Sequence, residues 1–165
     1  MDKVNKIAVL CGGSSSEREI SIQSGEGVHN AICNLGYKSD LIDFKNLINL
    51  DELKTYDFVF IALHGFEGEG GKLQKDLEDL NILYSGSGPE ACRKTWNKKV
   101  TKKILRENNI NTPVSLDISE FSLKVANFNL STSTFDRFRP FNYLFLKPDE
   151  DGSSIDIFKI SDEES

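Results

Sequence analysis

The sequence contains no apolar run that approaches the roughly 20 residues needed for a membrane-spanning helix. Its N-terminal apolar run, Lys6–Cys11, is short, ends in two glycines and is not followed by the small-residue cleavage pattern of a secretory signal. We therefore interpret this run as a strand rather than a signal peptide, and we expect no association with a membrane.

Cysteine is also scarce, and the 20 basic residues are outnumbered by 26 acidic ones. The three cysteines, Cys11, Cys33 and Cys92, are odd in number and unrelated in spacing. They match no disulfide framework and no metal-binding pattern, so reduced thiols in the cytoplasm are expected. The net charge of -6 argues against a general nucleic-acid binder.

The residues that are present are typical of a globular protein. The chain has 165 residues, of which 38% are hydrophobic and 28% charged. In the first half, short apolar runs alternate with helical patterns, which predicts a parallel α/β sheet with helices on both faces. The expected strands are 6–11, 37–44, 58–63 and 82–84, and the expected helices are 17–35 and 72–80.

The pattern changes after Gly88, where the strict alternation ends. Residues Pro89–Asn109 are predicted to be helical in two pieces, followed by a short strand at 112–116. Apolar runs at Tyr143–Lys147 and Ile155–Ile160 predict a hairpin around the loop Pro148–Ser154, whereas 119–140 indicates no regular structure. We expect one domain at 1–96 and the beginning of a second, incomplete domain at 97–165. Its aromatic residues predict exposed apolar surface and self-association.

The segment CGGSSSERE joins the first expected strand to the first expected helix. One interpretation is a serine N-cap with Glu17 and Glu19 in the first helical turn. A second is that Glu17 projects into a cleft and pairs with a substrate ammonium. The segment matches neither a Walker loop nor a dinucleotide fingerprint.

A second polar segment follows the strongest expected strand. His64 comes directly after FVFIAL, at the carboxyl edge of the sheet, where α/β proteins bind ligands. It is either a structural histidine or a cleft-facing group that titrates near neutral pH. Glu69 lies among three glycines and is either a solvated turn residue or a support for this loop.

Two lysines are candidates for binding phosphate. Lys98 belongs to a basic stretch, 93–103, most of which is expected to be a solvated helix face. Lys147 ends an apolar strand, and the loop after it carries backbone donors at Gly152, Ser153 and Ser154 that could fold over phosphates. The acidic run 149–151 opposes this interpretation unless its side chains point outward.

Taken together, these segments resemble the D-alanine–D-alanine ligases of the ATP-grasp superfamily. Five motifs carry the resemblance, in the family's order: KIAVLCGGSSSEREISIQSG (6–25), FIALHGFEGEGGKLQKDLE (60–78), LYSGSG (83–88), WNKKVTK (96–102) and LKPDEDGSS (146–154). The resemblance implies a Rossmann-like (pre-ATP-grasp) sheet followed by the start of an α+β ATP-grasp domain. It also implies a reaction in which ATP phosphorylates one D-alanine and the amine of a second attacks the acylphosphate, giving a dipeptide for peptidoglycan.

The resemblance also implies roles for individual residues. Glu17 would bind the ammonium of the first D-alanine, His64 would lie beside that substrate, and Glu69 would support the loop. Ser153 would join the catalytic hydrogen-bond network of Glu17. The ATP phosphates would be held by Lys98, Lys147, Gly152, Ser153 and Ser154. ATP and Mg²⁺ are the expected cofactors, no Mg²⁺ ligand is assigned in this chain, and a homodimer is compatible with the family.

The chain departs from the family at several positions. Glu69-Gly70-Gly71 replaces a Glu-Asp-Gly loop, Lys75 and Asp156 replace glycines, and Trp96-Asn97 replaces Met-Asp. The chain is also about half as long as family members, so we expect an N-terminal portion or a truncated product. Two alternatives are a non-catalytic remnant that binds a small ligand or partner, and a ligase that uses D-lactate or D-serine as its second substrate.

Overall fold

The computed structural model describes residues 4–115, 141, 143–152 and 156–161. The chain divides into two compact units. The first contains Met1–Asn97 and Asp151–Ser153, and the second contains Lys98–Glu150 and Ser154–Ser165. Each unit is described by itself below.

The first unit is built on a three-stranded parallel sheet. Its strands are β1 (Lys6–Cys11), β2 (Lys38–Asp43) and β3 (Phe58–Ile61), in the order β2-β1-β3. β1 lies in the middle, and its residues Ala8, Val9 and Leu10 are fully buried. A continuous apolar run is what a strand covered on both faces requires.

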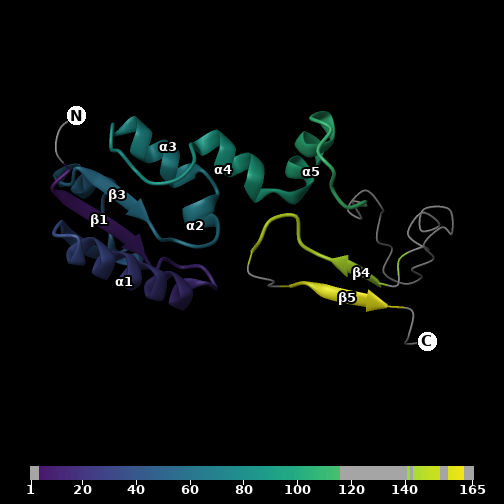
Figure 1. Ribbon diagram of the computed structural model, residues 1–165, viewed down its shortest axis with the longest axis horizontal. Helices are drawn as coiled ribbons and strands as arrows, with labels where there is room; N and C mark the ends of the chain where they lie inside the picture. The colour runs from purple at the N-terminus through teal and green to yellow at the C-terminus, as the bar shows by residue number, and fades with distance from the viewer. Residues whose placement is uncertain (1–3, 116–140, 142, 153–155, 162–165) are drawn as a thin grey trace. The chain divides into compact units, whose positions relative to one another are not determined.

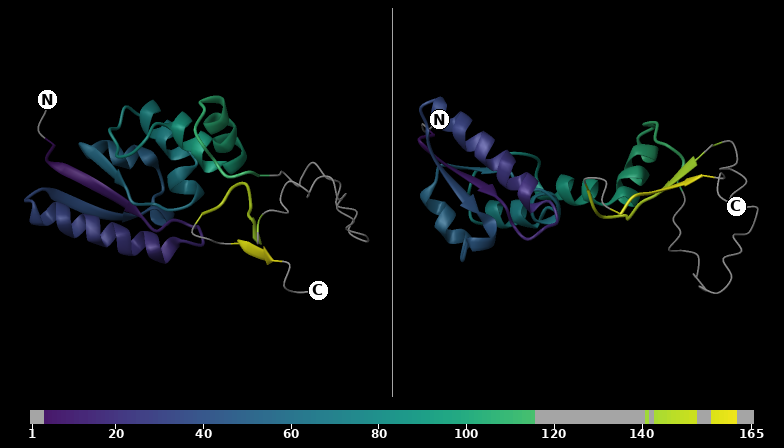
Figure 2. Two further views of the ribbon diagram at one scale, coloured as in Figure 1. Left: turned by 45° about the vertical axis from the view of Figure 1, so that its right-hand side comes forward. Right: turned by 90° about the horizontal axis from the view of Figure 1, so that it is seen from below.

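Helices cover both faces of this sheet, as predicted (Figures 1 and 2). On one face, Ala8 and Leu10 of β1 join a core cluster with Leu73 and Leu77 of α3 (Lys72–Asp79). On the other face lies α1 (Arg18–Asn34). A Cβ added to Gly25 of this helix would lie 2.5 Å from the Cβ of Cys11, so the glycine permits close packing of α1 on β1.

Shorter elements complete the first unit. Two 3₁₀ turns, η1 (Phe44–Asn46) and η2 (Leu50–Thr55), connect β2 to β3. After β3 come the one-turn helix α2 (Phe66–Glu69) and, beyond α3, α4 (Pro89–Trp96). Pro89 begins α4, a position where its missing N–H costs nothing.

The predicted fourth strand at 82–84 is wrong. Tyr84 forms only an isolated parallel bridge with Val59, through two backbone hydrogen bonds that flank it. The ladder stops there because the next donor, the N–H of Ile61, is taken by the Ser85 side chain at 2.9 Å. Asn81 and Gly86, on either side, have positive φ and turn the chain away from an extended path.

The second unit contains a helix, α5 (Lys98–Glu107), and an antiparallel hairpin of β4 (Tyr143–Leu146) and β5 (Phe158–Ser161). The helical stretch in two pieces and the hairpin were both predicted. The expected strand at 112–116 is not formed over 112–115. Side chains of α5 bind this segment instead: Lys102 donates to the Pro113 carbonyl at 2.8 Å and Arg106 to Ser115 Oγ at 2.8 Å.

The hairpin exposes aromatic side chains, including Tyr143, Phe145 and Phe158, each at least half exposed. The segment 119–140, for which we predicted no regular structure, lies outside the described residues. In the part of the chain that the structure describes, no helix combines the length and the apolar character needed to cross a membrane.

Candidate functional site

The candidate site lies at the carboxyl edge of the sheet in the first unit. Two loops meet there: residues 12–17, which follow β1, and residues 62–71, which follow β3. This edge is where parallel α/β sheets bind ligands, because the loops leave the strands side by side.

The backbone donors of the first loop are bound by side chains of the protein itself. Each of the first three N–H groups after β1 donates to a different element: Gly12 to Ser21 Oγ (2.9 Å), Gly13 to Asp43 Oδ1 (3.3 Å) and Ser14 to Glu67 Oε2 (2.7 Å). A glycine-rich strand-to-helix loop usually offers such donors to an anionic ligand. Here the N–H groups of residues 12–14 are occupied by side chains of the protein itself.

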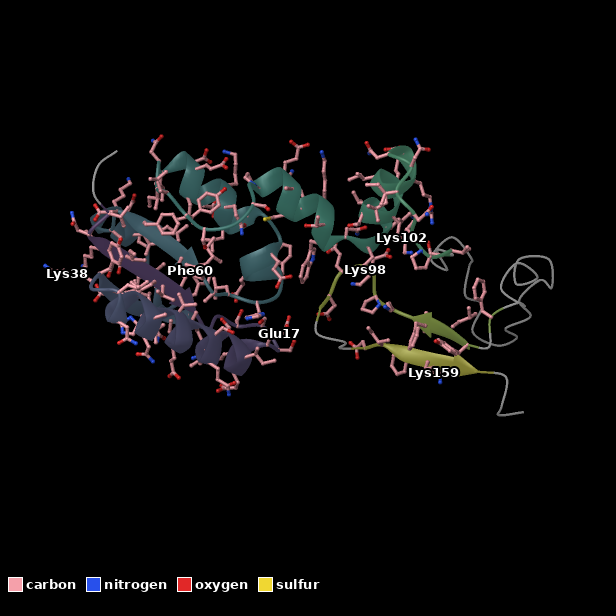
Figure 3. All side chains as sticks on the ribbon, in the orientation of Figure 1. Glu17, Lys38, Phe60, Lys98, Lys102 and Lys159 are labelled. Carbon is pink, nitrogen blue, oxygen red and sulfur yellow. The ribbon has the colours of Figure 1, made fainter. Side chains whose placement is uncertain are left out.

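Glu17 lies at the N-terminal end of α1 (Figure 3) and is only 4% exposed. A Cβ added to Gly65 would lie 3.5 Å from Glu17 Oε2, which puts this carboxylate against the second loop. Glu17 itself is the N-cap residue and makes no side-chain cap, so the serine N-cap interpretation is wrong. Its N–H instead donates to Ser15 Oγ at 3.3 Å.

His64 is brought to the same place. Its ring Nε2 lies 3.2 Å from Ser24 Oγ of α1, and its backbone carbonyl accepts a hydrogen bond from Ser15 Oγ at 3.2 Å. The imidazole is half-buried between the two loops and the helix. The first and second loops are thus joined through His64 and Ser15.

Glu69 is exposed, and its Oε1 accepts the Gly65 N–H at 3.2 Å. This bond closes the turn that begins α2, so Glu69 supports the loop rather than pointing at the buried carboxylate. The loop is tightly packed at Gly68, where an added Cβ would lie 2.3 Å from the Leu63 carbonyl oxygen. Gln74, which is 3% exposed, adds a bond from its Nε2 to the Gly68 carbonyl at 2.6 Å.

Two residues that the sequence did not single out, Glu67 and Arg18, also contribute to this site. Glu67 holds Ser14 through both the N–H and the hydroxyl, at 2.7 and 2.8 Å. Arg18 donates to the Gly13 carbonyl at 2.8 Å and forms an ion pair with Asp43 at the end of β2. The partners are 53 and 25 residues apart in the chain, so no local pattern predicts these pairs.

The predicted phosphate-binding lysines lie in the second unit. The N–H of Lys98 donates to the Asp149 carbonyl at 2.9 Å, which ties the start of α5 to the hairpin loop. Lys147 is exposed at the end of β4, with its Nζ 5.5 Å from the centre of the Phe145 ring. Burial lowers the pKa of Lys102, and the charges of Arg106 and Lys147 lower it further, so these three cations lie close enough to repel one another.

Most of the basic stretch 93–103 was expected to be a solvated helix face, and within it Lys102 is half-buried. The other loop residues are only partly described. Gly152 groups with the first unit, and its N–H donates to the side chain of Asp151 at 2.8 Å. Ser153 and Ser154 lie outside the described residues.

Among the described residues no three histidine, cysteine, aspartate or glutamate side chains cluster as metal ligands.

Comparison with solved structures defines the class of protein. A D-alanine–D-alanine ligase from Bacillus anthracis, complexed with ATP, aligns with a TM-score of 0.73 and 30% identity over 96% of this chain and 51% of its own. The D-alanyl-alanine synthetase A of Vibrio cholerae aligns with a TM-score of 0.73 and 27% identity over 96% of this chain and 52% of its own. The chain has the fold of the N-terminal half of an ATP-grasp ligase.

Sequence comparison narrows the class to a family. A D-alanine–D-alanine ligase of Bordetella petrii is 38% identical over 160 residues, 96% of this chain and 46% of the relative. One from Thermotoga sp. (strain RQ2) is 39% identical over 163 residues, 96% and 49% respectively. No protein-family model matches the chain. By sequence and fold, the chain is homologous to the N-terminal half of the D-alanine–D-alanine ligases, and it spans about half the length of the curated relatives it matches.

The ion pair between Arg18 and Asp43 is expected to make the stability of the fold depend on pH. The hydrogen bond from Arg18 holds the pKa of Asp43 at about 2, below its ordinary 3.8. A carboxyl with a lowered folded pKa stabilises the fold above the unfolded pKa, and this contribution disappears as the pH falls through the folded pKa.

Asp43→Asn is therefore expected to lower the free energy of unfolding at pH 7 by about 1 kcal/mol, a value reduced for partial exposure. The difference from the unaltered chain should shrink between pH 4 and pH 2, as followed by urea unfolding. Asp51→Asn, which removes a more exposed pair with Lys54, is the control and should change stability much less. A constant difference across this pH range would contradict the assignment.

Proposed function

We propose that the first unit binds D-alanine as the first substrate of an ATP-dependent D-alanine–D-alanine ligase. In this proposal Glu17 takes the ammonium of the amino acid, His64 lies beside the substrate, and Glu69 fixes the loop that carries His64. The names of the relatives and the resemblance of all five motifs support the substrate and the reaction.

The observation that carries the proposal is the buried carboxylate of Glu17 beside a glycine loop whose own donors are occupied. Glu17 is 4% exposed, and the N–H groups of residues 12–14 bind side chains of the protein. An anionic ligand would meet a negative charge here, and the donors of residues 12–14 are already occupied. A small cationic group would instead gain a charge-assisted hydrogen bond. An amino-acid ammonium fits this chemistry.

We infer that the second unit is the beginning of the ATP-grasp domain and that 1–96 and 97–165 are the two domains. Lys98 and Lys147 hold ATP phosphates, and Gly152, Ser153 and Ser154 form the loop over them. The fit to a polyphosphate is supported by the backbone bond between Lys98 and the hairpin loop and by the mutual repulsion of Lys102 and Lys147. Bound ATP supplies the phosphoryl group that activates the D-alanine carboxylate.

We further propose that Ser153 joins the hydrogen-bond network of Glu17, as the resemblance implies. Mg²⁺ accompanies ATP in this proposal, although we assign it no ligand among the described residues, which hold no suitable cluster. We infer a cytoplasmic enzyme of peptidoglycan precursor synthesis. Its three free thiols, one of them exposed, are typical of a reducing compartment.

Replacing Glu17 tests the ammonium site. Glu17→Gln keeps the size of the side chain and removes its charge, so we expect D-alanine to bind about 10- to 100-fold more weakly, the loss typical of a charged hydrogen bond. Isothermal titration calorimetry measures this change in Kd. The control is Glu19→Gln, an exposed glutamate two residues away that should bind D-alanine unchanged. Equal affinity of the two variants would refute the role of Glu17.

Replacing Lys147 tests the phosphate site independently. Lys147→Met removes one cation near the hairpin loop, and we expect ATP to bind several-fold more weakly and with a shallower dependence on salt, because screening weakens charge attraction. Fluorescence titration with a labelled ATP analogue measures both quantities. Lys159→Met, at an exposed lysine of β5, is the matched control. If both variants bind the nucleotide like the unaltered chain, Lys147 does not hold phosphate.

A further inference from the structure

Glu67 forms a two-point contact between the two loops of the candidate site. Its Oε2 accepts the Ser14 N–H at 2.7 Å, and its Oε1 accepts the Ser14 hydroxyl at 2.8 Å. Both carboxylate oxygens of Glu67 therefore accept hydrogen bonds from Ser14. Charge-assisted bonds of this kind are shorter and stronger than neutral ones, and a pair of them also fixes orientation.

The backbone around Ser14 is shaped for this contact. Gly13 has φ +79°, and a Cβ added to it would lie 2.1 Å from Glu67 Oε2. Any other residue at this position would be strained and would collide with the carboxylate. The glycine therefore explains how the loop and Glu67 approach so closely.

The contact lies close to the buried carboxylate of Glu17. Ser15 follows Ser14 directly. Its hydroxyl donates to the His64 carbonyl at 3.2 Å and accepts the Glu17 N–H at 3.3 Å. Glu67 at one end and His64 at the other hold the loop that leads into Glu17. If the Ser14 end were released, this loop would keep the bonds of Gly12 and Gly13 on the β1 side and of Ser15 to His64, but it would lose its attachment to α2 directly before Ser15.

We propose that Glu67 is a positioning residue for the amino-acid site: its two hydrogen bonds to Ser14 hold the first loop in place and so set the orientation of Glu17. The inference rests on the proposed function, because the effect of Glu67 is measured as a change in the affinity for D-alanine. Glu67 acts here through geometry rather than through its charge. A glutamine at this position can also satisfy Ser14, with the amide oxygen accepting the N–H and the amide nitrogen donating to the hydroxyl.

The test compares Glu67→Gln with Glu67→Ala in the 165-residue chain, using calorimetry with D-alanine. Glu67→Gln should keep the Kd within about twofold, whereas Glu67→Ala should weaken binding about five- to tenfold, the loss of roughly one net hydrogen bond. In a Ser14→Ala background the effect of Glu67→Ala should be smaller, since one of the two bonds is already absent. Glu26→Ala, at an exposed glutamate of α1, is the control.

Amide hydrogen exchange of Ser14 provides a readout that does not depend on substrate. Its protection should be kept in Glu67→Gln and lost in Glu67→Ala. Unchanged D-alanine affinity in Glu67→Ala, despite lost protection, would overturn the proposal. Equal weakening in both variants with protection kept in Glu67→Gln would show an effect of charge and would also overturn it. A protected Ser14 amide in an unaltered chain that binds no D-alanine would instead refute the proposed function on which the inference rests.

Discussion

The structure of the first unit depends on the hydrogen bonds made by the backbone N–H groups that directly follow the buried strand β1. Three consecutive N–H groups face the interior edge of the site, and each is bound by a side chain from a different element: Ser21 of α1, Asp43 of β2 and Glu67 of α2. Gly12 and Gly13 are buried, where unsatisfied donors would be costly, whereas Ser14 is exposed. These bonds fix the path of the loop, and the start of α1 follows from that path, with Glu17 buried against Gly65.

The same bonds bear on the chemistry of the first unit, whereas lysine side chains bear on that of the second. Because the glycine loop of the first unit has its donors occupied and a carboxylate beside it, this unit is suited to a cation. The second unit has Lys98 at the start of α5 and Lys147 directly after β4, cations that suit an anion, although the exposed carboxylates of Asp149 and Glu150 follow Lys147 in the same loop. A ligase that activates an amino-acid carboxylate with ATP needs both kinds of site. The division of charge between the units is thus consistent with the family to which the chain is related.

Much of this could be predicted from the sequence because the signals are local. The apolar runs of β1 and β3, the amphipathic α3 and the hairpin were predicted from periodicity, and Glu17 and His64 from their position after strands.

Other features depend on contacts between residues that are distant in the sequence. Glu67 and Glu69 look equivalent among their glycines, and only the fold directs one to Ser14 and the other to Gly65. The segments 82–84 and 112–115 read as strands, but side chains of Ser85 and Lys102 take the backbone groups that a ladder would use. Asp156 replaces a family glycine and adopts φ +52°, a conformation that aspartate tolerates better than most residues.

The central claim, that the buried carboxylate of Glu17 binds the ammonium of D-alanine, is tested most directly by NMR titration of the ¹⁵N-labelled chain. Addition of D-alanine should shift the amide signals of Ser15, Glu17 and Gly65, because these groups line the buried carboxylate. L-alanine at the same concentration should shift them much less. Shifts that appear elsewhere in the chain, or that are equal for the two enantiomers, would contradict the account.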